Sequence, residues 1–197
     1  ILGLFTDSKV TKEVLKKLPH LKAIITFSTG FDHIDLAETK KRGIIVSNVP
    51  SYGDYTVAQH TLTLILALSK KLFESVKRVK EGVYDYHGMR GFDLRGKTIG
   101  IIGTGKIGKA VIKMLVGFEM NIIAYDPFPD KEFAKANNFT YLALNSLLKE
   151  ADIVSLHVPL LKETKHLLNA KNIKLLKPTA YVINTSRGGL VDGEALL

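Results

Sequence analysis

Cysteine is absent from this 197-residue sequence. Disulfide bonds, catalysis by a thiolate and zinc sites built on cysteine are therefore excluded within these residues. The six histidines include no pair at the spacing of metal ligands, so we expect no metal site. We expect structural roles for them, because His20, His33 and His60 lie in helix or loop contexts and His157 lies at the buried end of a strand.

Long hydrophobic runs are also missing. No apolar stretch approaches the ~20 residues that a membrane-spanning helix needs, and the most apolar one, Thr61–Leu68, is predicted to be one side of a buried helix. The sequence shows no signal-peptide pattern and no initiator methionine, and residues 1–5 resemble the middle of a fold. We therefore expect a cytoplasmic location, no membrane partner, and a chain truncated at both ends relative to a longer protein.

Acidic residues are outnumbered, 19 against 28 lysines and arginines, which gives a net charge of +9. Such a balance can attract nucleic acid or steer anionic substrates. The lysines are spread along segments with helical spacing, opposite apolar residues, so we interpret them as solvated helix faces and expect no nucleic-acid partner. The alternative, nucleic-acid binding, predicts an affinity that falls steeply with salt.

Short apolar runs alternate with helical segments, which predicts parallel strands joined by right-handed crossovers. Strands are predicted at 1–5, 23–27, 44–47, 98–102, 121–125, 153–158 and 180–184. Helices are predicted at 9–18, 36–42, 57–80, 106–118, 131–137, 145–150 and 170–176. The fold class is therefore α/β, a doubly wound parallel sheet at 53–197 preceded by part of a second domain at 1–52, with a turn-rich break at Pro50–Asp54.

Helix 57–80 is long enough to bridge two domains or to line a subunit interface. The irregular arm that follows it, 82–96, carries several aromatic side chains. The arm favours packing on a partner, although a loop folded over its own core fits the sequence equally well.

The predicted strand 98–102 runs directly into Gly103, Gly105 and Gly108, spaced as Gly-x-Gly-x-x-Gly, and then into a helix. In that order the glycines give a tight turn, a close approach of the backbone to a pyrophosphate, and close packing of helix on strand. Asp126 follows the next strand, where an acid can accept hydrogen bonds from a ribose hydroxyl and would repel a 2′-phosphate. The pattern predicts a dinucleotide site that prefers NAD to NADP.

Ligands of open parallel sheets bind at the carboxyl ends of the strands. Arg187, three residues beyond strand 180–184, would place a planar cationic donor there, suited to a carboxylate or a polarised carbonyl. The alternative is a structural ion pair with Asp192. The Ser28–Gly30 turn, after strand 23–27, presents backbone N–H groups that can hold a carboxylate, or it is an ordinary turn.

These features together resemble the D-isomer-specific 2-hydroxyacid dehydrogenase family, and the resemblance covers essentially the whole chain. The matching segments are Ser28–Asp35, Val57–Thr61, Gly103–Gly108, His157–Pro159 and Asn184–Gly189. Within the family, the region from Val49 to His60 and the Gly30–Asp35 stretch are most similar to D-lactate dehydrogenases.

The resemblance implies a Rossmann-type NAD domain and part of a flavodoxin-like substrate domain. It makes Arg187 the catalytic residue that binds and polarises a 2-keto acid, and it assigns the substrate to Thr29, Gly30 and Tyr52. Besides the three glycines, it implies that NAD is bound by Lys106, Ile107, Asp126, Val158, Pro159, Thr164, Thr185 and Ser186. A homodimer through helix 57–80 and the following arm is implied as well.

The implied reaction transfers a hydride between NADH and a 2-keto acid to give a D-2-hydroxy acid, with pyruvate and D-lactate favoured. Hydroxypyruvate, glyoxylate and 3-phosphoglycerate are alternative substrates, and a non-catalytic, NAD-sensing corepressor is an alternative class. Gln59 departs from the glutamate common in the family. The family's catalytic glutamate and histidine would lie beyond Leu197, so we expect these 197 residues alone to be nearly inactive, since a general acid contributes ~10²–10⁴-fold.

Overall fold

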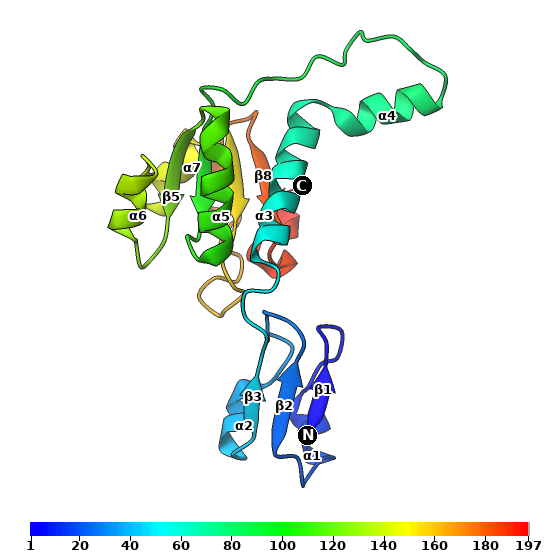
Figure 1. Ribbon diagram of the computed structural model, residues 1–197, viewed down its shortest axis with the longest axis vertical. Coiled ribbons are helices and arrows are strands. Elements are labelled where there is room, and N and C mark those ends of the chain that lie inside the picture. Colours follow the sequence, from blue (N-terminus) through cyan, green and yellow to red (C-terminus); the bar gives the residue numbers. More distant parts are fainter. Residues whose placement is uncertain (197) are drawn as a thin grey trace. The chain divides into compact units, whose positions relative to one another are not determined.

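A computed structural model describes residues 1–196, and the chain divides into two compact units, Ile1–Gly53 and Asp54–Leu197 (Figure 1). The division falls in the turn-rich Pro50–Asp54 segment. None of the helices in the described part of the chain is both long and apolar enough to cross a membrane.

The first unit is a three-stranded parallel sheet in the order β1-β2-β3. Its elements are β1 (Leu2–Leu4), α1 (Lys12–Lys16), β2 (Ala23–Thr26), α2 (Leu36–Lys41) and β3 (Ile45–Ser47). Both helices begin at a side-chain cap, Thr11 for α1 and Asp35 for α2, which satisfies a backbone N–H that lacks a helical partner. Leu15 and Ile24 are fully buried at the centre of its core.

The second unit is built on a five-stranded parallel sheet in the order β6-β5-β4-β7-β8. The strands are β4 (Thr98–Ile102), β5 (Asn121–Tyr125), β6 (Thr140–Tyr141), β7 (Ile153–Leu156) and β8 (Tyr181–Asn184). The helices are α3 (Asp54–Ser69), α4 (Leu72–Lys80), α5 (Lys106–Leu115), α6 (Lys131–Ala136), α7 (Leu144–Glu150) and α8 (Gly193–Leu196). The strand order reverses beside β4, which is the switch point where open sheets bind ligands.

Both faces of this sheet are covered, because successive side chains of a strand point to opposite sides. Ile99 and Ile101 of β4 join the core that includes residues of α3 and α5, and Ile102 joins the core that includes residues of α7 (Figure 1). Gly100 leaves room for α7, since a Cβ at this position would lie 2.4 Å from Cδ2 of Leu147. The predicted α/β class is confirmed.

The predicted strands 98–102 and 121–125 match β4 and β5 to the residue, and the other predicted strands overlap observed ones. The helix predicted at 170–176 is wrong, because only a single 3₁₀ turn forms, at Ile173–Leu175. The Asn169 side chain accepts a hydrogen bond from the N–H of Lys171, and the Asn172 side chain accepts one from the N–H of Asn169. Such side-chain bonds to the backbone compete with helix formation. Three short elements escaped prediction, namely β6, the 3₁₀ turn Gly188–Leu190 and α8.

The continuous helix predicted at 57–80 is also wrong. It is two helices, α3 and α4, separated at Lys71, whose φ of 49° lies in the left-handed region. The Ser69 carbonyl accepts a hydrogen bond from the N–H of Phe92 at 2.8 Å, on the segment that returns from α4. Gly91 permits that approach, because a Cβ there would lie 2.1 Å from the Ser69 oxygen. The returning chain therefore ends α3 by taking its terminal carbonyl.

Candidate functional site

The glycine turn after β4 has the geometry that the motif predicts. Gly103 has a φ of 93°, and a Cβ on it would lie 2.6 Å from Cγ1 of Val158. A Cβ on Gly108 would lie 2.0 Å from the Gly103 carbonyl oxygen, so only glycine lets α5 pack this close to the turn. The space around Gly105 is open, because a Cβ on this residue would meet none of the described residues within 4 Å beyond its chain neighbours.

Gly105 is the N-cap of α5, and no side chain caps that helix end. The first N–H groups of a helix are attracted to anions, and open space above a glycine admits a phosphate group closely. Lys106 and Ile107 begin the helix, the former exposed and the latter packed against the core. The residues present therefore fit the pyrophosphate of a dinucleotide.

Asp126 lies beside this turn because the β4–β5 register pairs Ile102 with Tyr125, and Gly103 and Asp126 follow them. Its Oδ2 accepts hydrogen bonds from the N–H of Thr104 at 2.7 Å and from the Thr104 hydroxyl at 2.9 Å. Its Oδ1 accepts one from the N–H of Phe128 at 2.9 Å. The carboxylate is thus fixed at the edge of the sheet, next to the glycine turn.

Strand β7 ends at Leu156, two residues earlier than predicted, and Val158 and Pro159 lie in the loop that follows. Val158 contacts the glycine turn at Gly103, as described above. The Thr164 hydroxyl closes the same loop, since it donates to the Pro159 carbonyl at 2.6 Å and accepts from the N–H of Leu161 at 2.7 Å. The role of these three residues in holding NAD stays a prediction.

His157 is buried at the end of β7. Its Nε2 lies 2.9 Å from the Ser155 hydroxyl, and its Nδ1 has no hydrogen-bond partner among the described residues. Burial disfavours the charged imidazolium and lowers the pKa of His157 from 6.5 to about 4. The imidazole is therefore neutral near pH 7, which fits the structural role expected for it.

Arg187 is half-buried at the end of β8, in a turn held by side-chain hydrogen bonds. Asn184 Oδ1 accepts from the N–H of Ser186 at 3.0 Å, and its Nδ2 donates to the Arg187 carbonyl at 2.9 Å. The Ser186 hydroxyl donates to the Leu156 carbonyl at 2.9 Å, which ties the turn to β7. Sequence reasoning missed Asn184, although an asparagine two residues before a turn N–H is a recognisable signal.

A cavity of about 480 Å³ opens where α3 meets the end of β8. It is lined by Thr56, Val57, His60, Leu64, Asn184, Thr185 and Ser186. One of its sides is fixed by a hydrogen bond of 2.9 Å between the hydroxyls of Thr185 and Thr61. Thr185 and Ser186 are thus brought together, beside the turn that carries Arg187.

In the first unit, the Ser28–Gly30 turn rests on a partly buried series of hydrogen bonds. The Ser28 hydroxyl donates to the Gly30 carbonyl at 2.7 Å, so Thr26 must donate its own proton to Ser28 Oγ, also at 2.7 Å. His33 Nε2, 3.1 Å from Thr26 Oγ1, must then carry the proton of that last bond. His33 therefore has a structural role, as expected, because it holds the turn through Thr26 and Ser28.

The outer side of this turn is braced by residues 48 and 49. The Thr29 hydroxyl donates to the Val49 carbonyl at 3.2 Å, and Asn48 Nδ2 donates to the Thr29 carbonyl at 2.8 Å. Tyr52 lies a few residues further on and is 61% exposed. Substrate contact by Thr29, Gly30 and Tyr52 stays a prediction.

Residues 62–197 match the family model described as "D-isomer specific 2-hydroxyacid dehydrogenase, NAD binding domain". A glyoxylate reductase of Thermofilum pendens is 43% identical over 202 residues, covering 100% of this chain and 59% of that protein. A D-3-phosphoglycerate dehydrogenase of Methanocaldococcus jannaschii is 39% identical over 197 residues, covering 100% of this chain and 38% of that protein. The chain thus spans little more than half, or less, of these curated relatives.

Among solved structures, D-lactate dehydrogenase of Aquifex aeolicus, complexed with NAD and lactic acid, superposes with a TM-score of 0.94 at 42% identity. The match covers 98% of this chain and 58% of that one. The chain belongs to the D-isomer-specific 2-hydroxyacid dehydrogenase family. Its second unit has the family's Rossmann-type NAD-binding fold, and its cofactor is NAD.

Proposed function

We propose that the protein is an NAD-dependent oxidoreductase that interconverts a 2-keto acid and a D-2-hydroxy acid. The observation that carries the proposal is the placement of the Arg187 turn and the glycine turn at the same edge of one sheet. Bound NADH supplies the hydride. The residues of this chain bind the cofactor and orient the acid.

Arg187 has the chemistry to bind and polarise the substrate. Its guanidinium is planar, permanently charged and able to donate two parallel hydrogen bonds to a carboxylate or to a carbonyl oxygen that gains negative charge. The hydrogen bonds of Asn184 and Ser186 fix the backbone from which this side chain projects. A preorganised cation stabilises developing charge without having to move during the reaction.

Thr29 and Gly30 would bind the substrate carboxylate through backbone N–H groups, and Tyr52 would contact the substrate. The support for this role is the partly buried series of hydrogen bonds among Thr26, Ser28 and His33, which holds the turn in one conformation. A fixed turn loses little conformational entropy on binding, so its N–H groups bind an anion more tightly. In this proposal residues 1–52 form part of the substrate domain and residues 53–197 the NAD-binding domain.

Proton transfer to the keto oxygen requires a general acid, and the buried, neutral His157 does not qualify. We therefore propose that the 197 residues by themselves reduce a keto acid at least ~10²-fold more slowly than the complete gene product, as expected without a general acid. Steady-state assays of both polypeptides side by side test this. Equal turnover by the two would contradict it.

Pyruvate and D-lactate are the favoured substrate pair. The support is the similarity to a D-lactate dehydrogenase solved with lactic acid, while other relatives are named for glyoxylate and phosphoglycerate. The test compares kcat/KM for NADH oxidation by the complete gene product with pyruvate, hydroxypyruvate, glyoxylate and 3-phosphohydroxypyruvate. The highest value with pyruvate supports the pair, and oxidation with none of the four would contradict the oxidoreductase function.

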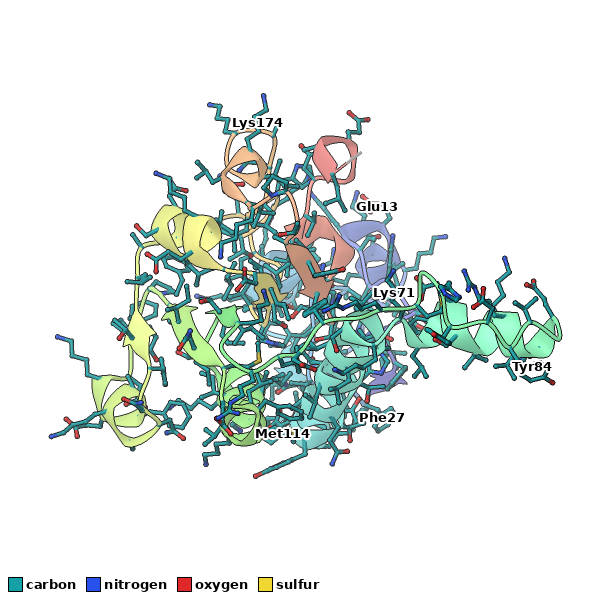
Figure 2. All side chains as sticks on the ribbon, turned by 90° about the horizontal axis from the view of Figure 1, so that it is seen from above. Glu13, Phe27, Lys71, Tyr84, Met114 and Lys174 are labelled. Carbon is teal, nitrogen blue, oxygen red and sulfur yellow. The ribbon has the colours of Figure 1, made fainter. Side chains whose placement is uncertain are left out.

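We also propose a homodimer formed through α3, α4 and the arm after them. None of the residues of α4 is buried within the described chain, and Phe73 and Val79 are 62% and 55% exposed. Figure 2 shows Tyr84 just beyond the outer end of α4, away from the sheet of its own unit. The end of the arm returns to the core of its own unit, where Leu94 is buried, whereas Tyr84 and Tyr86 stay 82% and 78% exposed. An exposed apolar surface of this kind favours a protein partner. A cytoplasmic location completes the proposal, and cell fractionation tests it.

A further inference from the structure

The hydrogen bonds around Asp126 extend beyond the residues that the glycine motif identifies. The Thr104 hydroxyl, which contacts Asp126, also lies 2.9 Å from the hydroxyl of Tyr141 on β6. The Tyr141 oxygen in turn accepts a hydrogen bond from the N–H of Asp130 at 3.3 Å. Thr104 is buried, and Tyr141 and Asp126 are half-buried, so these bonds are shielded from solvent.

Counting the available protons fixes which group donates and which accepts in each of these hydrogen bonds. An ionised carboxylate only accepts hydrogen bonds, so the one hydroxyl proton of Thr104 points to Asp126 Oδ2. Tyr141 must therefore donate its proton to Thr104 Oγ1, and it accepts from the backbone of Asp130. Each group in the series thus donates to the next one, and the last, Thr104, donates to the Asp126 carboxylate.

The residues of this hydrogen-bond series that lie furthest from Asp126 are held by helices α5 and α6 and by a neighbouring aromatic ring. Asp130 caps α6 by accepting from the N–H of Phe133 at 3.0 Å, and it forms an ion pair with Lys109 of α5. The Tyr141 ring packs edge-on against Phe139, with ring centroids 5.2 Å apart. Tyr141 is thus held by its ring as well as by its hydroxyl, and it can hold Thr104 in turn.

These hydrogen bonds determine which acceptor positions of the Asp126 carboxylate remain for a ligand. Both acceptor positions of Oδ2 are occupied by Thr104, while Oδ1 accepts only from Phe128 among the described residues. One acceptor position on Oδ1 therefore remains for a ribose hydroxyl. An aspartate without these bonds could rotate away from a 2′-phosphate, whereas this one is held in place.

We propose that Thr104 and Tyr141 are positioning residues that set the preference for NAD over NADP. They hold the Asp126 charge where a 2′-phosphate would lie, so the repulsion cannot be relieved by rotation of the carboxylate. The proposal rests on the family's cofactor and not on the proposed substrate, so it is testable by binding alone.

The experiment measures dissociation constants of NAD⁺ and NADP⁺ by isothermal titration calorimetry on the complete gene product. Thr104→Val removes only the hydroxyl and Thr104→Ser keeps it, while Tyr141→Phe removes the second donor. Tyr125→Phe is the matched control, because Tyr125 lies on neighbouring β5 and its hydroxyl makes none of the hydrogen bonds described to Asp126. Thr104→Val is also made in an Asp126→Ala background.

We expect the ratio of the NADP⁺ to the NAD⁺ dissociation constant to fall about tenfold in Thr104→Val, the effect of one charge-assisted hydrogen bond. A smaller fall is expected in Tyr141→Phe, with no change in Thr104→Ser or Tyr125→Phe. On the Asp126→Ala background, Thr104→Val should leave the ratio unchanged, because its effect passes through the carboxylate.

A purely structural role predicts a different outcome, in which both constants rise together and their ratio stays the same. That result in Thr104→Val and Tyr141→Phe would overturn the proposal. An unchanged effect of Thr104→Val without the Asp126 carboxylate would overturn it too. Wild-type protein that binds NADP⁺ as tightly as NAD⁺ would contradict the underlying role of Asp126, and failure to bind either would contradict the cofactor itself.

Discussion

Arg187 depends on its neighbours for its position. The residue itself has extended backbone angles, and the Asn184 side chain bridges the turn on both sides of it. Asn184 is the last residue of β8, and Ser186 is hydrogen-bonded to β7. The sheet therefore fixes the position of the backbone from which the Arg187 side chain extends. The charge of the residue and its place at the edge of the sheet are both needed for the proposed chemistry.

Replacement of Arg187 by Gln should lower kcat/KM for the 2-keto acid ~10²–10³-fold, the typical cost of removing one donor to a developing oxyanion. The dissociation constant of NADH should stay within about twofold, because the glycine turn and Asp126 are unchanged. Arg95→Gln is the matched control, since Arg95 is exposed and paired with Glu119 on the surface. Equal losses of kcat/KM in both variants would contradict the assignment of Arg187.

At this scale the sequence predicted part of the site. The three glycines and Asp126 were recognisable, because each has a spacing fixed by the turn and by the end of a strand. Thr104 occupies a variable place within the motif, and its contact with Tyr141 depends on the non-local pairing of β4, β5 and β6. Pairing of that kind leaves no periodic signal in the chain, so the carboxylate's anchor could not be predicted.

At the scale of elements, the turn between β4 and α5 has the least room for change. Gly108→Ala would put a Cβ 2.0 Å from the Gly103 carbonyl oxygen, and α5 would have to shift to relieve the overlap. We expect a loss of about 1–3 kcal/mol of unfolding free energy, as for other overpacked sites, together with weaker NAD binding. Thermal unfolding and calorimetric titration measure the two effects.

Gly117→Ala is the control for that change, because its would-be Cβ meets none of the described residues within 4 Å outside its own helical turn and chain neighbours, and its φ is not positive. Its effect on unfolding should stay within about 0.5 kcal/mol, as at most open surface sites. If Gly108→Ala were as mild as Gly117→Ala, the close packing described for α5 would be contradicted.

The end of β7 predicts a pH dependence of stability. The pKa of His157 is lowered from 6.5 to about 4 in the folded protein by burial, so between these values the unfolded chain binds a proton that the folded chain does not. Stability should therefore be full above pH 6.5 and fall as the pH drops toward 4. The loss amounts to about 3 kcal/mol at most, from 1.36 kcal/mol per pKa unit.

Urea unfolding of wild type and His157→Gln at pH 7 and pH 5 measures this contribution. The difference in unfolding free energy between the two pH values should shrink in the variant, because its side chain does not titrate. His20→Gln, on the surface of the first unit, serves as the control. An identical pH dependence in all three proteins would show that His157 is not the titrating group.

Elements were predictable where local sequence decides them. Strands β4 and β5 are rich in isoleucine and are followed directly by Gly103 and Asp126, and their ends were predicted to the residue. The α3–α4 break was not predictable, because the apolar spacing continues past Lys71 while the break is made by Phe92 and Gly91 from a distant segment. Helix 170–176 failed for a local reason, the competition of asparagine side chains with backbone hydrogen bonds.

At the scale of the whole molecule, the exposed apolar face of α4 and the arm after it lead us to expect a dimer. Phe73→Glu together with Val76→Glu would put two charges on the exposed apolar face of α4, and burying them in an interface would be costly. Size-exclusion chromatography with light scattering should give a dimer for wild type and a monomer for this variant. Glu74→Lys, at an exposed position on the opposite, polar side of α4, should leave the dimer intact.

A wild-type monomer at micromolar concentration would contradict the proposed dimer. A dimer that survives both glutamates on α4 would place the interface elsewhere. Far-UV circular dichroism of each variant confirms that α4 and the sheet are still folded, so that a change of mass can be attributed to the interface.

The most direct test of the account is the configuration of the product that the complete gene product forms from pyruvate and NADH. If the NAD domain and Arg187 act as proposed, NADH is oxidised and chiral chromatography finds D-lactate alone. Formation of L-lactate, or no oxidation of NADH with pyruvate or any of the other three keto acids, would contradict the assignment.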